Sequence, residues 1–212
     1  MRQTPTKTDP GPLLLTVPGI DNSGPEHWQT LWEHDLESCH RAELGMWHRP
    51  HRNSWVTKLN AAIVAARRPV VLIAHSLGCH AVAWWNTLEK KPTGRVIGAL
   101  LVAPPNLEGT PFDSRLCAFA PLVRDRLRFP SVLVASEDDP YASFGHSRKM
   151  ARLWGSRFVN AGWLGHINAD SRIGDWPFGR FLLQQFLLDL EEPRMRPLRS
   201  MRPKPENELR AN

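Results

Sequence analysis

Short apolar runs alternate with longer amphipathic segments along most of the chain. Five of the apolar runs have the length of buried strands, and a sixth, at 42–47, is a weaker candidate. The six runs cover residues 13–17, 42–47, 70–74, 96–103, 131–135 and 157–160. Apolar residues recur at helical spacing in the segments 27–36, 55–66, 143–154 and 178–190 and in the stretch that follows Gly78. Because strands alternate with helices, we expect an α/β fold with a mainly parallel sheet of about six strands, flanked by helices on both faces.

The connection from 106 to 129 is longer than the others and has weak periodicity. Prolines at 111 and 130 interrupt it. It is compatible with a short cap over a site and equally with an irregular crossover between two strands. The sequence leaves both open, and little or no lid is expected.

The length of 212 residues favours one domain with a sizeable core, which we place at residues 13–192. Residues 1–12 are polar, and residues 193–212 are rich in Pro and Arg, so both ends are expected to be disordered. No run of about 18 apolar residues is present, so no membrane span is predicted. The first residues also lack the apolar core of a signal peptide.

The net charge of +6 is concentrated at the two ends of the chain. Residues 193–212 account for +4 of it and residues 1–12 for +1, which leaves the body close to neutral. The charge therefore says little about what the folded domain binds, and no nucleic-acid partner is required, although a basic tail of this kind can bind anionic partners weakly. The three cysteines are too few for a disulfide framework, which fits a reducing cytoplasm.

One apolar run ends in a turn that carries a candidate nucleophile. After the strand at 70–74, Ser76 stands at the apex of a tight turn, followed by Leu77, Gly78 and a helical pattern. This is the setting of the G-x-S-x-G nucleophile elbow, in which the two small residues are expected to pack against each other. Ala74 replaces the first glycine and adds one methyl group, whereas Gly78 is kept. A serine that only caps the following helix would give the same pattern, so the motif needs support from elsewhere.

That support comes from two later loops. A pair of aspartates follows the strand at 131–135, and His166 follows the strand at 157–160. With Ser76 they stand in the order serine, acid, histidine, which is the order of α/β-hydrolases. All three also follow parallel strands, so they are expected at one edge of the sheet. An acyl-transfer serine needs a base and an acid that orients the base, so the sequence predicts a serine hydrolase for a small ester, thioester or amide.

The choice of acid lies between Asp138 and Asp139. Pro140 restricts the residue before it to an extended conformation, which would hold the carboxylate of Asp139 in place. We therefore assign Asp139 as the orienting acid and His166 as the base, and interpret Asp138 as a solvated or turn-capping neighbour.

The oxyanion of such a reaction needs two backbone N–H donors. We expect one from Leu77, which follows the nucleophile, and the other from Ile20, in the loop after the first strand. Gly19 would give the backbone close access to the substrate. Gly19 and His75 are therefore candidate substrate-binding residues.

Five segments carry a wider similarity. They are P-G-I-D-N-S-G-P-E-H-W-Q-T-L-W at 18–32, W-H-R-P with a further Trp at 47–55, A-H-S-L-G-C at 74–79, D-D-P-Y at 138–141 and G-H-I-N at 165–168. In these segments the chain resembles the small serine hydrolases of the YdeN and retinoblastoma-binding-protein type. The resemblance implies a compact α/β-hydrolase with a triad of Ser76, Asp139 and His166, and it implies no particular substrate. The L-x-C-x-E motif is missing, so a retinoblastoma partner is not carried over.

Metal and nucleotide chemistry find less support. The pairs His48 and His51, and His75 and His80, have no Cys or carboxylate at ligand spacing, so no metal is expected. No phosphate-binding glycine motif is present, so no cofactor is expected either.

Two further assignments concern the surroundings of the site. His27 follows the oxyanion loop and is compatible with a substrate contact, but a surface residue at a helix start is the favoured interpretation. Trp47, Trp55 and Trp163 lie near strand ends and are candidates to line an acyl pocket. The alternative function is a non-catalytic binding protein on a hydrolase fold, against which three intact triad residues argue.

Overall fold

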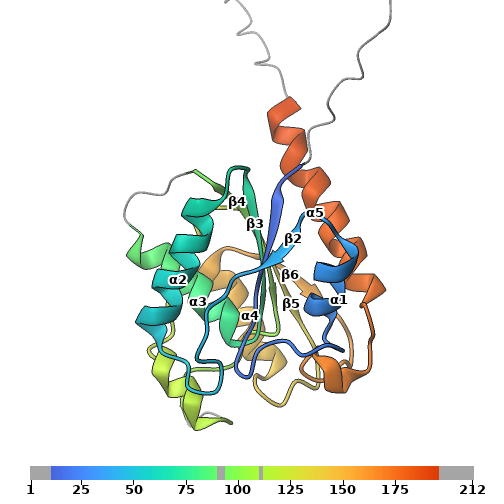
Figure 1. The fold of residues 1–212 in the computed structure, drawn as a ribbon. Coiled ribbons are helices and arrows are strands. Elements are labelled where there is room, and N and C mark those ends of the chain that lie inside the picture. Colours follow the sequence, from blue (N-terminus) through green and yellow to red (C-terminus); the bar gives the residue numbers. More distant parts are fainter. Residues whose placement is uncertain (1–10, 90–93, 110–111, 196–212) are drawn as a thin grey trace, which may run out of the picture.

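The computed structural model describes residues 11–89, 94–109 and 112–195 and has a six-stranded sheet at its centre (Figure 1). All neighbouring strands are parallel, in the order β2-β1-β3-β4-β5-β6. The strands are β1 (Leu13–Val17), β2 (Cys39–Arg41), β3 (Val70–His75), β4 (Val96–Val102), β5 (Ser131–Ala135) and β6 (Arg157–Asn160). The predicted α/β fold is thereby confirmed.

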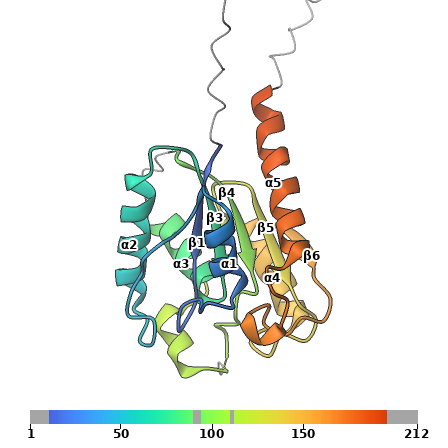
Figure 2. The same cartoon turned by 45° about the vertical axis from the view of Figure 1, so that its right-hand side comes forward.

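Helices cover both faces of this sheet, as Figure 2 shows from the side. They are α1 (Trp28–Asp35), α2 (Arg52–Ala65), α3 (Leu77–Leu88), α4 (Phe144–Trp154) and α5 (Pro177–Met195), with 3₁₀ turns η1 (Ser114–Phe119) and η2 (Ala169–Ser171). Side chains alternate between the two faces along each strand: Leu72 of β3 packs into the core below α2, α3 and α4, whereas Val71 and Ile73 pack below α1 and α5. The central strands are buried on both faces, which explains their continuous apolar runs.

The weaker strand at 42–47 was predicted in the wrong place. β2 ends at Arg41, and the N–H of Ala42 makes a last bond to Thr16 O at 2.9 Å. Gly45 and Met46 then adopt positive φ angles of 63° and 49°, which a strand does not permit. The apolar pattern arises instead because Ala42 and the following loop pack into the core near α2.

Part of the connection between β4 and β5 forms a wall of the cleft described below. Among its described residues, the helical part is the short 3₁₀ helix η1. The turn is anchored by Phe119, whose ring lies 5.4 Å from that of Trp55 and whose carbonyl accepts a hydrogen bond from Trp84 Nε1 at 2.8 Å. Asp113 and Arg115, at its start, line the cleft.

The ends of the domain differ slightly from the sequence-based boundaries. α5 continues to Met195, three residues beyond 192. Residues 1–10 and 196–212, which include most of the segments predicted to be disordered, lie outside the described residues. Among the helices that the structure describes, none is long and apolar enough to cross a membrane.

Candidate active site

Ser76, His166 and Asp139 form a continuous chain of hydrogen bonds at the carboxyl edge of the sheet. Ser76 Oγ lies 2.8 Å from His166 Nε2. On the other side of the imidazole, Nδ1 lies 2.9 and 3.0 Å from the two carboxylate oxygens of Asp139. All three residues are at least nine-tenths buried. Because a carboxylate only accepts, the proton is on Nδ1, and Nε2 is free to accept the hydroxyl proton of Ser76.

Ser76 occupies a strained turn between β3 and α3. Its φ of 53° and ψ of −128° are unusual for a residue with a side chain, and such outliers gather at functional sites. Its side chain makes no capping bond to α3, so the simple capping interpretation fails. The end of β1 lies closest to Gly78: a Cβ there would stand 2.1 Å from Val17 O, so this contact by itself requires glycine.

The two aspartates after β5 have separate partners. Asp139 Oδ1 accepts the N–H of Tyr141 at 2.9 Å while the carboxylate faces His166. Asp138 Oδ1 instead accepts Ser136 Oγ at 2.6 Å and the N–H of Gly165 at 2.8 Å. These hydrogen bonds lower the pKa of Asp138. Asp138 therefore ties the loop before His166 to the end of β5, whereas Asp139 is the aspartate that bonds the imidazole of His166.

The loop of His166 is held from three sides. His75 Nε2–H donates to the carbonyl of His166 at 2.9 Å, and Trp28 Nε1–H donates to the carbonyl of Ile167 at 2.8 Å. The ring of Tyr141 packs 4.2 Å from the imidazole, centroid to centroid. Sequence reasoning missed Trp28 and Tyr141. The only signal for either was position, since Tyr141 follows the Asp-Pro pair directly.

The loop after β1 lies against the nucleophile. A Cβ on Gly19 would stand 2.7 Å from Ser76 Cβ, so only glycine allows this approach. Ile20, the next residue, lines the cleft beside Ser76. Asp21, beyond it, is bound by both terminal nitrogens of Arg115 at 2.9 and 3.1 Å, and this contact lowers the pKa of Asp21. Arg115 thus joins the loop to η1, an arrangement for which the sequence held no signal.

Ser76 and His166 line a cleft of about 290 Å³ whose lining is largely polar. Its polar lining residues include Asp21, Asn22, His27, His75, Asp113, Arg115, Asn168 and Asp170. The predicted tryptophans do not contribute: Trp55 is fully buried, and Trp163 is 75% exposed. The interpretation of His27 as a surface residue was also wrong, because its side chain is 5% exposed and lines the cleft.

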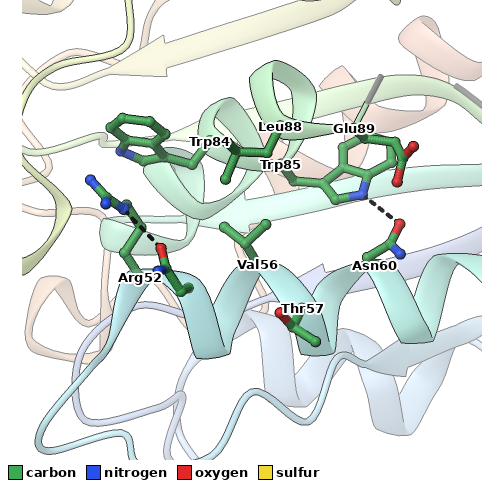
Figure 3. Close-up of a pocket in the computed structure, with 9 residues that line it drawn as sticks. Arg52, Val56, Thr57, Asn60, Trp84, Trp85, Leu88 and Glu89 are labelled. Carbon is green, nitrogen blue, oxygen red and sulfur yellow. Dashed lines mark hydrogen bonds between the residues drawn. The ribbon is translucent and has the colours of Figure 1, made fainter. Parts of the chain in front are cut away.

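A second cavity, of about 500 Å³, lies between α2 and α3 (Figure 3). Arg52 lies over the ring of Trp84 at 4.2 Å, and Trp85 Nε1–H donates to Asn60 Oδ1 at 3.0 Å. The two cavities share no lining residue, so the cleft at Ser76 is a separate site.

The described ranges hold no group of three or more His, Cys, Asp or Glu side chains placed to bind a metal ion. His48 contacts Asp21 at 2.6 Å, and His80 Nε2–H donates to the carbonyl of Pro105 at 2.8 Å. Three of the four histidines considered as metal pairs, His48, His75 and His80, thus make other hydrogen bonds.

A hydroxyl, an imidazole and a carboxylate in this geometry, on the strand ends of a parallel α/β sheet, define the class of serine hydrolases. The comparison with protein families agrees, since the model of the serine hydrolase family matches residues 14–185. The chain belongs to this family and is an esterase-like hydrolase of the YdeN type.

Solved structures support this assignment. A protein described as a YdeN-like hydrolase from Pectobacterium atrosepticum is 29% identical, with a TM-score of 0.74 over 85% of this chain and 92% of that one. The ydeN gene product of B. subtilis is 18% identical, with a TM-score of 0.68 over 82% and 98%. Est1E from Butyrivibrio proteoclasticus is 13% identical, with a TM-score of 0.62 over 86% and 89%, and shares the fold. A search of curated proteins found no match.

Proposed function

We propose that the protein hydrolyses a small ester, thioester or amide through an acyl-enzyme on Ser76, with His166 as base and Asp139 as orienting acid. The observation that carries the proposal is the unbroken hydrogen-bond chain from Ser76 Oγ through the imidazole to the carboxylate. The strained backbone of Ser76 adds support, because it presents the hydroxyl at the head of the cleft.

In the first half of the reaction, Ser76 Oγ attacks the substrate carbonyl while His166 Nε2 takes the hydroxyl proton. The negative oxygen that develops is stabilised by the backbone N–H groups of Ile20 and Leu77. Asp139 holds the Nδ1 proton and stabilises the imidazolium that forms. The imidazolium then gives its proton to the leaving alcohol, thiol or amine, and the acyl group remains on Ser76.

In the second half, a water molecule replaces the leaving group. His166 takes a proton from this water, which attacks the acyl carbonyl, and the collapse of the second tetrahedral intermediate returns the proton to Ser76 Oγ. The acid is released, and the chain of hydrogen bonds is restored. His75 and Gly19 act by positioning other groups. His75 donates a hydrogen bond to the carbonyl of His166, and Gly19 lets the loop after β1, which carries Ile20, approach Ser76.

The test is covalent labelling with a fluorophosphonate probe, followed by turnover of p-nitrophenyl esters of increasing acyl length. Ser76→Ala should abolish labelling and lower ester turnover by about 10³-fold or more. Ser143→Ala makes the same chemical change at the exposed start of α4 and should label like the wild type. A binding protein without hydrolase activity would leave the wild type unlabelled, and a Ser76→Ala protein with full turnover would rule out the proposed nucleophile.

We place this activity in the cytoplasm. The support is that Cys39, Cys79 and Cys117 are all free thiols, as in a reducing compartment. The basic residues from 196 onward lie outside the described residues, and weak binding of anionic partners by them stays a prediction.

A further inference from the structure

His27 precedes α1 and is held there by its own ring. Its Nδ1 accepts the N–H of Gln29 at 3.2 Å, which satisfies one of the free donors at the helix start. The backbone N–H of His27 in turn donates to Gly24 O at 3.0 Å. The first hydrogen bond fixes the ring of His27 against the start of α1, and the second fixes its backbone against the preceding loop.

The same hydrogen bond decides which nitrogen of His27 carries the proton. Burial lowers the pKa of His27 to about 3, so the imidazole is neutral at ordinary pH. Because Nδ1 accepts, the proton of a neutral ring is on Nε2. Nε2 is buried and finds no hydrogen-bond partner among the described residues. A buried donor without an acceptor costs about 1–3 kcal/mol, so this one calls for an explanation.

The neighbours of His27 do not supply an acceptor. The ring of His75 meets it edge to face at a centroid distance of 4.7 Å, but its Nε2–H donates to the carbonyl of His166, and His27 Nε2 makes no hydrogen bond to the His75 ring. Trp28, on the other side at 5.4 Å, offers only a donor, which is used by Ile167. His27 also lines the cleft together with Ile20 and Ser76. The residue that carries the unpaired donor thus belongs to the lining of the cleft that holds the proposed nucleophile.

We propose that His27 binds substrate, with its Nε2–H donating to an oxygen of the substrate other than the scissile carbonyl. The substrates would then be small esters that carry an ether or hydroxyl oxygen close to the reacting bond, in preference to plain alkyl esters. The polar lining of the cleft favours the same class, because Asn22, Asn168 and Asp170 offer hydrogen bonds and little apolar surface. This inference rests on the proposed hydrolase activity at Ser76.

The Nε2–H donor of His27 would distinguish a substrate that carries the additional oxygen from an alkyl analogue that lacks it. An alkyl analogue would fill the same space and leave the Nε2–H unpaired, as it is in the free protein, so only the oxygen-bearing substrate gains a hydrogen bond from it. A neutral hydrogen bond of this type should give a preference of about 3- to 10-fold.

The variant His27→Asn separates this role from the structural one. Asparagine is among the best residues at a helix start, so its oxygen can still accept the N–H of Gln29, but it has no group at the place of Nε2. The melting temperature of the His27→Asn protein should therefore stay close to that of the wild type.

Two pairs of substrates that exchange CH₂ for O test the donor. p-Nitrophenyl methoxyacetate against p-nitrophenyl butyrate tests the acyl side, and 2-methoxyethyl acetate against butyl acetate tests the alcohol side. For wild type, the ratio of kcat/KM in one pair should exceed the ratio of alkaline hydrolysis rates by about 3- to 10-fold, and this measurement does not depend on the folding of any variant. In His27→Asn that excess should vanish.

Three results would overturn the inference. They are a wild type without excess preference in either pair, a variant that keeps the preference, and a variant that loses both members of a pair equally, which would show a purely structural role. Fluorophosphonate labelling of Ser76 in the same samples separates these outcomes from a failure of the proposed hydrolase function, in which the wild type itself would not be labelled.

Discussion

Replacing Asp139 by Asn should disable the imidazole through the orientation of the new amide. Asp139 Oδ1 accepts the N–H of Tyr141, and Oδ2 lies 3.0 Å from His166 Nδ1. In Asp139→Asn the amide oxygen is needed at the position of Oδ1, because the N–H of Tyr141 must have an acceptor. The NH₂ group then takes the place of Oδ2, 3.0 Å from His166 Nδ1, where a protonated Nδ1 would meet it donor to donor even though Oδ1 stays within 2.9 Å, so the tautomer in which Nδ1 accepts is favoured. The proton moves to Nε2, where it blocks transfer from Ser76.

The size of the loss in kcat/KM follows from two energy costs that add. Flipping the amide restores the productive tautomer but leaves the N–H of Tyr141 without an acceptor, at a cost of about 1–3 kcal/mol. In addition, the charge-assisted bond to the imidazolium is lost, which contributes about 1.5–3 kcal/mol. The sum of about 2.5–6 kcal/mol corresponds to a reduction of kcat/KM by roughly 10²- to 10⁴-fold.

The matched control makes the same change one residue earlier. Asp138→Asn keeps an oxygen at Oδ1 for Ser136 and the N–H of Gly165, so its kcat/KM should stay within about 5-fold of wild type. Both variants are measured on a p-nitrophenyl ester, with melting temperatures to verify folding. If Asp138→Asn is the more damaged of the two, or if Asp139→Asn retains full activity, the assignment of the acid is refuted.

Two further predictions concern stability, measured by urea unfolding. Gly78→Ala should unfold the domain or destabilise it severely, because its Cβ would lie 2.1 Å from Val17 O. The control Gly145→Ala in α4, with open space around its Cβ, should be neutral or stabilising by up to about 1 kcal/mol. A Gly78→Ala protein as stable as the wild type would contradict the predicted clash with Val17 O. Burial lowers the pKa of His80 to about 4 from the ordinary 6.5, so in acid the unfolded chain binds a proton that the folded one refuses, and stability present above pH 6.5 is lost as the pH falls towards 4. This loss is about 2 kcal/mol near pH 5 for His80 alone, and His80→Gln should remove it; an equal loss in both proteins would contradict the prediction.

Sequence-based prediction succeeded where the cause is local. The strands at 13–17 and 131–135 were predicted with their observed bounds because strands buried on both faces need continuous apolar runs. The short edge strand at 157–160 was also predicted with its observed bounds, although none of its residues is buried. Ser76 was found because a strand, a tight turn and a helix succeed one another within a few residues. The loops of Asp139 and His166 could be predicted to lie near it because parallel strands end at a common edge.

The tertiary structure decided the features that depend on segments far apart in the chain. Position 78 must be glycine because of Val17, 61 residues earlier. Arg115 reaches Asp21 across 94 residues and so becomes part of the cleft wall. Neither contact leaves a local pattern, since hydrophobic periodicity reports which face of an element is buried and not which element covers it.

The same limit applies to the chemistry of single side chains. The sequence placed His27 at a helix start, but only the packing of His75 and Trp28 around it shows that it is buried and lines the cleft. The choice between two adjacent aspartates likewise depends on which carboxylate faces His166, a matter of side-chain direction after the end of β5. The sequence by itself therefore determined the fold and the candidate nucleophile, whereas the surroundings of the site were decided by contacts that form only when distant strands and loops meet.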